Sequence, residues 1–153
     1  KSKFLSVNAQ LNSLNSSYHS ICKYSKADYI CVHEGELQHE FRSKYEKIES
    51  LILKLQKKMK TANIVITQGS KGSISLNKKK FTTCPAFAEK VVDRTGAGDT
   101  IIAVSTLCFK QKIPDDITLL VGNVSAASTV LHLGTGNSIE KNEILKKIRY
   151  IFK

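Results

Sequence analysis

The sequence contains no tryptophan, only two prolines and one methionine, and no apolar run long enough to cross a bilayer. A membrane-spanning helix needs about 18 or more consecutive apolar residues. The nearest candidate, residues 117–133, is interrupted by glycine, asparagine, serine and histidine. The first residues also lack the apolar stretch of a signal peptide. We therefore expect a protein without a membrane partner.

Motifs that bind metals through cysteine are absent as well. The chain has four cysteines, and none of them forms a CxxC pair or a Cys/His pair with the spacing of zinc ligands. Each cysteine lies in or beside an apolar run, which is typical of reduced, buried thiols. The sequence thus predicts a cytoplasmic protein without a structural zinc site.

Arginine is scarce in a strongly basic chain. The net charge is +11, but only Arg42, Arg94 and Arg149 are arginines. Base edges and phosphates favour the arginine fork, and the lysine clusters at residues 54–60 and 78–80 lack interleaved aromatic residues. Nucleic-acid binding is therefore the least favoured of the functions considered, and a solvated lysine-rich surface is the simpler interpretation.

A length of 153 residues with 41% hydrophobic and 24% charged residues fits one globular domain. Apolar runs predict strands, and helical periodicity predicts an amphipathic helix at residues 48–59. The expected strands are 4–7, 29–32, 63–67, 73–76 and 81–84, and the later helices are 96–111, 115–133 and one starting at Ser138. We expect Asp115 and Asp116 to cap the long helix and Ser138 to cap the last one. Strands that alternate with helices predict an α/β fold with a mostly parallel sheet flanked by helices.

Residues 96–99 (GAGD) run directly into an apolar helical segment. The backbone N–H groups of Gly96, Ala97 and Gly98 would then lie at a helix N-terminus, where unpaired donors and the helix dipole attract anions. Asp99 beside such a site could take a proton from an attacking hydroxyl. The combination predicts phosphoryl transfer to an alcohol; a plain helix-capping loop is the alternative.

Residues 93–100 (DRTGAGDT) resemble the second signature, D-T-x-G-A-G-D, of the PfkB/ribokinase family of carbohydrate kinases. Four further segments match that family in the same order. Residues 27–36 resemble the strand that leads to its N-x-x-E motif, and residues 67–72 (TQGSKG) resemble its T-x-G-x-x-G turn. Residues 122–123 resemble the segment that flanks the adenine, and residues 133–138 resemble the stretch that closes its cation site. Residues 4–15 resemble the branch related to bacterial heptose-phosphate kinases. The resemblance implies a ribokinase-like fold.

The resemblance also implies a reaction, in which ATP and Mg²⁺, with K⁺ in some members, serve to phosphorylate a hydroxyl of a sugar or sugar phosphate. It implies that Asp99 is the general base and that Gly96, Ala97 and Gly98 form the anion hole. It places Thr67, Gly69, Gly72 and Asn123 near the nucleotide. It makes Glu36 the acid that orients water on Mg²⁺, and it assigns Asp93, Thr95 and Ser138 to a K⁺ site.

Three positions depart from the family pattern. Arg94 replaces a small or β-branched residue, Val104 stands where glycine or alanine is usual, and His33 takes the place of asparagine in N-x-x-E. A histidine at a strand end is more often a hydrogen-bonded structural residue than a ligand. These departures favour an alternative function, a non-catalytic nucleotide-binding or assembly module derived from a sugar kinase.

The resemblance covers only the C-terminal half of such kinases, whose single domain has roughly 300 residues. We therefore expect residues 1–153 to form a single partial domain that carries the ATP side and the base but lacks most of the sugar pocket. Alone, such a chain should turn over sugar poorly. We also expect self-association, or a partner that supplies the N-terminal half, through an exposed strand near residues 4–8.

Overall fold

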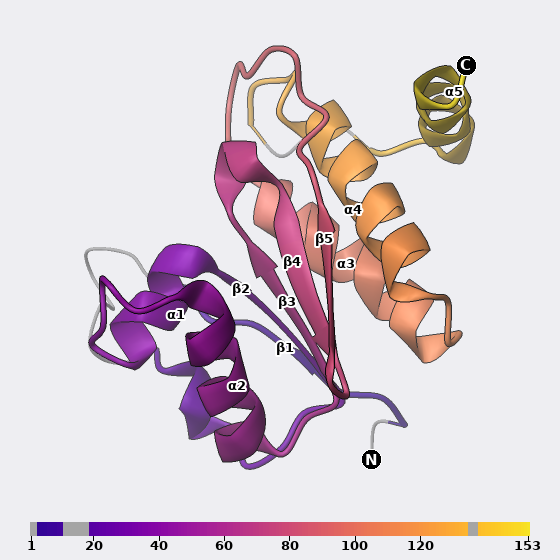
Figure 1. Cartoon of the computed structure of the whole chain (residues 1–153). Helices are drawn as coiled ribbons and strands as arrows, with labels where there is room; N and C mark the ends of the chain where they lie inside the picture. The colour runs from indigo at the N-terminus through magenta and orange to yellow at the C-terminus, as the bar shows by residue number, and fades with distance from the viewer. Residues whose placement is uncertain (1–2, 11–18, 135–137) are drawn as a thin grey trace. The chain divides into compact units, whose positions relative to one another are not determined.

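The structure is a computed structural model that describes residues 3–10, 19–134 and 138–153 (Figure 1). Residues 11–18 are rich in asparagine and serine, which predicts a loop, but they lie outside the described residues. Residues 135–137, which belong to the segment matched to the cation site, also lie outside them. The chain divides into two compact units, Lys1–Gln68 with Ile74–Thr82, and Gly69–Ser73 with Thr83–Lys153. Within the described ranges, none of the helices has the length and apolar character that a bilayer crossing requires.

The sheet has five strands in the order β1-β2-β3-β4-β5. They are β1 (Ser6–Val7), β2 (Tyr29–His33), β3 (Asn63–Thr67), β4 (Ser73–Asn77) and β5 (Lys80–Cys84). The first three are parallel, and β2 aligns with β3 from Tyr29 opposite Asn63 to His33 opposite Thr67. The α/β fold with a mostly parallel sheet is therefore confirmed.

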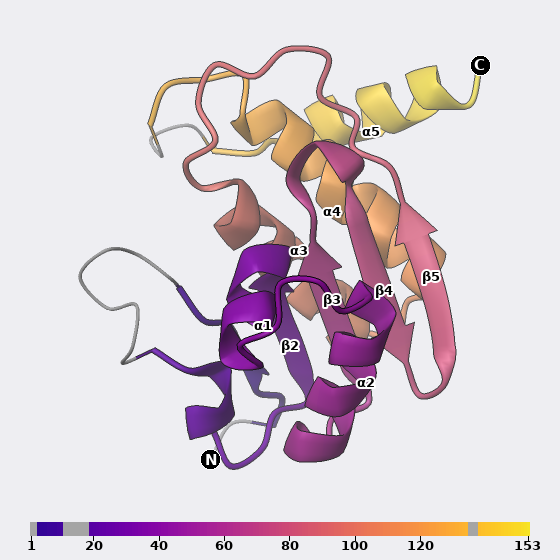
Figure 2. The ribbon, with the colours of Figure 1, turned by 60° about the vertical axis from the view of Figure 1, so that its left-hand side comes forward.

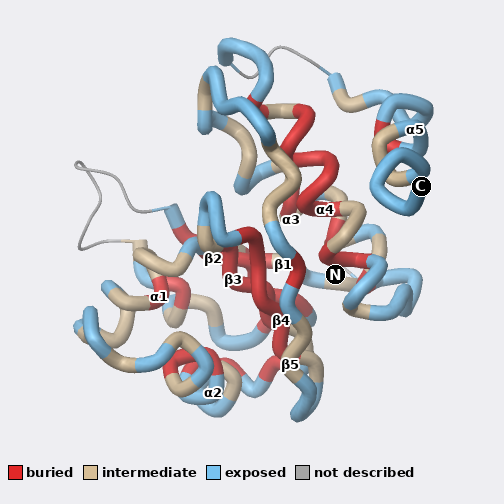
Figure 3. Tube along the Cα trace, turned by 45° about the horizontal axis from the view of Figure 1, so that its top comes forward, coloured by how far each residue is buried: buried red, intermediate tan, exposed pale blue. Residues whose placement is uncertain are grey.

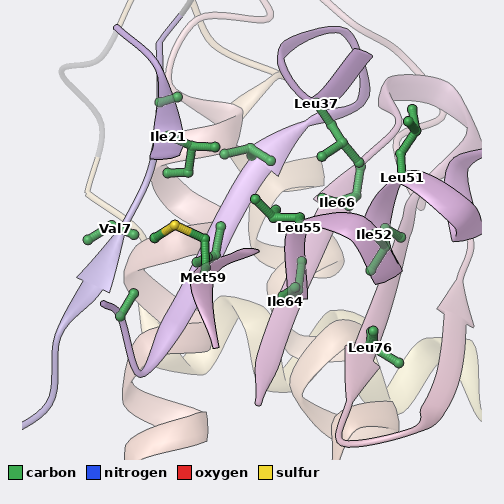
Figure 4. Packing of buried hydrophobic residues seen from close by; sticks show 14 of the residues in the cluster. Val7, Ile21, Leu37, Leu51, Ile52, Leu55, Met59, Ile64, Ile66 and Leu76 are labelled. Atoms are coloured by element: carbon green, nitrogen blue, oxygen red, sulfur yellow. The ribbon is translucent and has the colours of Figure 1, made fainter. Parts of the chain in front are cut away.

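The core of the first unit lies between the sheet and two helices, α1 (Glu34–Glu40) and α2 (Ile48–Met59) (Figure 2). A short 3₁₀ helix, η1 (Ile21–Lys23), adds Ile21 to the same cluster. Leu51, Ile52 and Leu55 of α2 are fully buried against Ile64 and Ile66 of β3 (Figure 4). Because these residues recur at helical spacing, the helix presents one continuous apolar stripe to the strands.

The second unit contains the 3₁₀ turn η2 (Gly69–Lys71) and the helices α3 (Ala97–Lys110), α4 (Asp115–Thr129) and α5 (Lys141–Ile151). Helix α4 is buried along residues 122–128 (Figure 3). A Cβ added at Gly122 would lie 3.8 Å from Ile101 Cγ2, an ordinary contact, so α3 and α4 approach closely at this point. Val104 of α3 is half-buried.

Three predictions about the later helices were wrong. Helix α4 ends at Thr129 rather than at Leu133, because the Val130 carbonyl accepts hydrogen bonds from the backbone N–H groups of residues 92 and 93. Pro114 is its N-cap, so Asp115 and Asp116 lie inside the first turn, where carboxylates still suit the helix dipole. The N-cap of α5 is Glu140, not Ser138.

The apolar residues of α5 are only partly buried. Only Ile144 is buried, whereas Leu145 is 40% exposed and Ile151 is 38% exposed. Helix α5 packs mainly against α4. A single neighbouring helix covers only part of such a stripe, so the remainder faces solvent.

Candidate active site

The helix start at residues 96–98 leaves backbone donors available. We call the N–H groups of Gly96, Ala97 and Gly98 the amide cradle. Gly96 is the N-cap, with a left-handed φ of 82°. Within the described part of the chain, the N–H of Ala97 alone of the three has a partner, Arg94 O, at 3.4 Å. That distance exceeds the usual 2.7–3.2 Å, and a Cβ placed on Gly98 would meet no atom within 4 Å. The amide cradle is therefore largely open.

Asp99 lies in the first turn of α3 and is exposed. Its side chain makes no hydrogen bond or ion pair with any residue in the described ranges. The next residue, Thr100, shares a hydrogen bond of 2.9 Å with the hydroxyl of Thr129. This bond fixes the start of α3 to the last turn of α4. The exposed carboxylate of Asp99 therefore lies at a helix end that is held in place.

Asp93 holds the segment before the amide cradle in place. Its Oδ1 accepts the N–H of Thr95 at 2.9 Å and the hydroxyl of Thr95 at 2.8 Å. Its Oδ2 accepts the N–H of Gly134 at 2.9 Å. These hydrogen bonds hold the pKa of Asp93 below its usual range. They occupy three of about four lone-pair sites on the carboxylate, and Ser138 is exposed, so the K⁺ site stays a prediction.

Residues 69–72, which we call the glycine turn, have a tight backbone. Gly69 has a φ of 59° and Gly72 a φ of 95°, and the N–H of Gly72 donates to Gly69 O at 3.0 Å. A Cβ on Gly72 would lie 2.0 Å from the carbonyl oxygen of Cys84. Glycine is thus required at residue 72 by both conformation and space. Thr67, at the end of β3 in the first unit, is buried.

Asn123, predicted to lie near the nucleotide, is buried in α4 with 5% exposure. Its amide nitrogen donates to Ser73 Oγ at 2.6 Å and to Leu119 O at 2.8 Å. Both amide hydrogens therefore have acceptors inside the protein. The structure places this side chain beside the glycine turn, and a contact with a nucleotide stays a prediction.

Glu36 and His33 form a capping box at the start of α1 in the first unit. The carboxylate of Glu36 accepts the N–H of His33 at 2.6 Å, and His33 Nδ1 accepts the N–H of Gly35 at 3.1 Å. The interpretation of His33 as a hydrogen-bonded residue at a strand end is confirmed. Over the described ranges, no three His, Cys, Asp or Glu residues gather as a metal site. A single carboxylate such as Glu36 fits Mg²⁺ that is held mainly by phosphates and water.

A cavity of about 660 Å³ in the second unit was not predicted from the sequence. Its lining comes from residues 87–90, from α4, from Leu131 just after α4, and from α5. The apolar lining residues include Phe87, Val124, Ala127 and Tyr150. Lys90, Lys146 and Lys147 add positive charge. Lys147 donates to Ser128 Oγ at 2.7 Å and pairs with Glu143 at 2.8 Å. The signal in the sequence that could have indicated this cavity is the combination of lysines and an aromatic residue near the end of α5. Helical periodicity alone does not show that this end packs against α4.

The second unit contains both the cavity and the helix start that carries the amide cradle, and the end of α4 contacts them on different faces. Ala127 and Leu131 line the cavity, and Thr129 between them bonds to Thr100 at the start of α3. Residues 127 and 129 are two positions apart in α4, so their side chains point to different faces of the helix. One end of α4 therefore contacts both the cavity and the helix start that carries Asp99.

The chain is similar to known proteins in both sequence and fold. The sequence model of the pfkB family carbohydrate kinases matches residues 2–142. The bifunctional protein HldE of Helicobacter pylori (strain HPAG1) is 33% identical over 116 residues, which cover 74% of this chain and 25% of that protein. HldE of Koribacter versatilis is 27% identical over 129 residues, which cover 82% of this chain and 26% of that protein. The chain thus spans about a quarter of the length of these curated relatives.

Solved structures show the same fold. Arabidopsis thaliana ribokinase, complexed with ribose and ATP, superposes with a TM-score of 0.71 and 25% identity, over 78% of this chain and 40% of that one. Escherichia coli phosphofructokinase-2, in complex with potassium, superposes with a TM-score of 0.78 and 14% identity, over 97% of this chain and 47% of that one. The second likeness concerns the fold alone.

Proposed function

The chain belongs to the pfkB family of carbohydrate kinases, and from this premise we propose that it provides the ATP side of a kinase that phosphorylates a hydroxyl of a sugar or sugar phosphate. The observation that carries the proposal is the start of α3, where an exposed carboxylate, Asp99, follows the largely open amide cradle. The chain spans about a quarter of its curated relatives. The sugar-binding half, from the same or another polypeptide, is therefore part of the proposal.

In the proposed reaction, Asp99 accepts the proton of the acceptor hydroxyl as its oxygen attacks the terminal phosphorus of ATP. The bond between that phosphorus and the bridging oxygen breaks, and ADP leaves. The N–H groups of Gly96 and Gly98, with the positive end of the α3 dipole, stabilise charge on the transferred group. Bound Mg²⁺ would neutralise phosphate charge, and the family resemblance is our reason for assigning Glu36 to orient its water.

The cavity is our candidate for the nucleoside end of ATP. Small-molecule sites are concave and mostly apolar, with a few polar groups that fix orientation. Phe87 and Tyr150 offer aromatic faces to a base, and the ammonium groups of Lys90 and Lys146 attract phosphates. In this proposal the base lies in the cavity and the phosphates lie at the amide cradle, which belongs to the same unit.

The proposal includes a cytoplasmic location. All four cysteines, at positions 22, 31, 84 and 108, are free. Burial raises the pKa of the Cys84 and Cys108 thiols. Burial, together with the hydrogen bond that the Cys22 thiol donates to the Glu40 carboxylate, raises the pKa of Cys22 to about 11. Such thiols stay protonated and unreactive near neutral pH, as expected for structural cysteines in a reducing compartment.

The test is Asp99→Asn in a protein that also contains the sugar-binding half. We expect phosphoryl transfer to fall about 10²- to 10⁴-fold, since that is the usual contribution of a general base, while ATP affinity changes less than about twofold. Asp116→Asn is the matched control, because it removes an exposed carboxylate from the first turn of α4. Unchanged transfer by Asp99→Asn would overturn the assignment of the base.

A second candidate function is a non-catalytic nucleotide-binding or assembly module. The observation in its favour is the capping box, because the Glu36 carboxylate that should serve Mg²⁺ also accepts the His33 N–H. The same experiment separates the two functions. If the unsubstituted protein binds ATP but transfers no phosphate to any sugar or sugar phosphate tested, the module is the correct description.

A further inference from the structure

The amide of Asn123 bridges two parts of the second unit. Its bond to Leu119 O, 2.8 Å long, fixes the side chain on the preceding turn of its own helix. The second amide hydrogen reaches Ser73 Oγ at 2.6 Å, across 50 positions of sequence. Asn123 is 5% exposed and Ser73 is 1% exposed. A short hydrogen bond between two buried side chains is costly to break, because each polar group would then lack a partner.

Ser73 directly follows the glycine turn, and the turn also packs closely against residues 84–86. A Cβ on Gly72 would lie 2.0 Å from Cys84 O, 2.6 Å from Pro85 C and 2.7 Å from Ala86 N. The backbone after Gly72 is thus pressed against the end of β5, while Ser73 is bonded to α4. The tip of the turn, Ser70 and Lys71, is exposed.

From these contacts we infer that Asn123 is a positioning residue, which holds the glycine turn through Ser73 and does not contact the nucleotide base. The inference rests on the proposed function, in which the glycine turn borders the phosphates of ATP. It replaces the expectation, drawn from family resemblance, that Asn123 lies beside the base. Both hydrogens of its amide are already used inside the protein, so a base would have to displace one of these bonds.

The two roles predict different nucleotide affinities. A positioning residue affects the binding of the phosphates, which ATP and GTP share. Ser73→Ala and Asn123→Ala should therefore each lower the affinities for ATP and for GTP by the same factor, about 5- to 100-fold. The double variant should bind little worse than either single variant, because both substitutions break the same bond between Asn123 and Ser73. Ser73→Thr keeps the hydroxyl, so its affinities for ATP and GTP should equal those of the unsubstituted protein. Titration of the full chain with ATP and GTP measures these values.

A base contact would give the opposite pattern. Asn123→Ala would then change the ratio of ATP to GTP affinity, whereas Ser73→Ala would leave both affinities unchanged. That result overturns the inference. Ser105→Ala is the control for general destabilisation, since it deletes a buried hydroxyl of the same unit that bonds within its own helix; it should leave both affinities unchanged.

Proteolysis tests the positioning role without any nucleotide. Lys71 is an exposed trypsin site in the glycine turn, and cleavage there follows local opening. Ser73→Ala and Asn123→Ala should both accelerate cleavage after Lys71, and Ser105→Ala should not. Unchanged cleavage in both variants overturns the inference. If the chain binds neither nucleotide, the proposed function fails, and the rate of cleavage at Lys71 still decides whether Asn123 holds the turn.

Discussion

The carboxylate of Asp93 accepts a hydrogen bond from the backbone N–H of Gly134 at 2.9 Å, across 41 positions of sequence. The same region has a second connection, because the N–H groups of Val92 and Asp93 both donate to Val130 O. The segment that leads into the amide cradle is therefore tied to the end of α4 at two points. The geometry of the proposed anion site depends on this connection as much as on its glycines.

This connection should depend on pH. Hydrogen bonds from Thr95 and Gly134 lower the pKa of Asp93, so its contribution to stability is complete above the unfolded-state pKa of about 3.9. It is lost as the pH falls through the lower folded-state value. Asp93→Asn should lower the unfolding midpoint at pH 7 and flatten the acid limb of the stability curve below about pH 4. Urea unfolding between pH 2 and 7 measures this, with Asp116→Asn as the charge-matched control; an unchanged acid limb would contradict the prediction.

Glu36 has a structural and a proposed catalytic role that one substitution can separate. Glu36→Gln keeps an oxygen that can accept the His33 N–H, so the unfolding free energy should change by less than about 0.5 kcal/mol. The same change removes the negative charge proposed to orient water on Mg²⁺. We expect the gain in ATP affinity on adding Mg²⁺ to shrink about tenfold.

Calorimetric titration with ATP, with and without Mg²⁺, checks this prediction. Glu34→Gln is the control, because Glu34 lies in the same first turn of α1 and its carboxylate accepts a hydrogen bond from Gln68. An equal loss in both variants would mean that charge in this turn, and not Glu36 itself, supports the metal.

The glycine turn allows two matched substitutions. Gly69→Ala adds a methyl group where no atom lies within 4 Å, at a φ of +59°, so it should cost about 1–2 kcal/mol of conformational strain. Gly72→Ala adds a Cβ that lies 2.0 Å from Cys84 O, at a φ of +95°. That clash with backbone has no flexible side chain to relieve it, so we expect a loss of more than about 3 kcal/mol. Chemical denaturation of both variants would refute this if their losses were equal.

The sequence predicted those elements whose signal is local. Strand β3 was predicted with the bounds that the structure shows, and the apolar residues of α2 follow the predicted stripe. A buried parallel strand is a continuous apolar run, and a helix that packs on one side repeats its apolar residues at helical spacing. Both patterns can be read without knowing the partner element.

Apart from the two N-caps, which were misplaced by one or two residues, the wrong and missing predictions involve partners that are distant in sequence. The end of α4 is set by Val130 O, which residues 92 and 93 occupy. Asn123 faces Ser73, which no periodicity connects to it. The cavity combines residues 87–90 with two helices. A resemblance to a family placed Asp99 and the amide cradle, since they form one short motif, but it could not show which other side chains are already bonded within the protein.

The cavity gives the most direct test of nucleotide binding. Tyr150 lines it and is 77% exposed, so Tyr150→Ala should have little effect on folding. Stacking of a base on an aromatic side chain is worth about 1–3 kcal/mol, and we expect ATP affinity to fall roughly 5- to 150-fold. Tyr45→Ala is the matched control, because Tyr45 is 92% exposed and belongs to the first unit. If Tyr150→Ala bound ATP as tightly as the Tyr45→Ala protein, the base would have to bind elsewhere, and the lysines around the cavity would lose their proposed role in attracting phosphates.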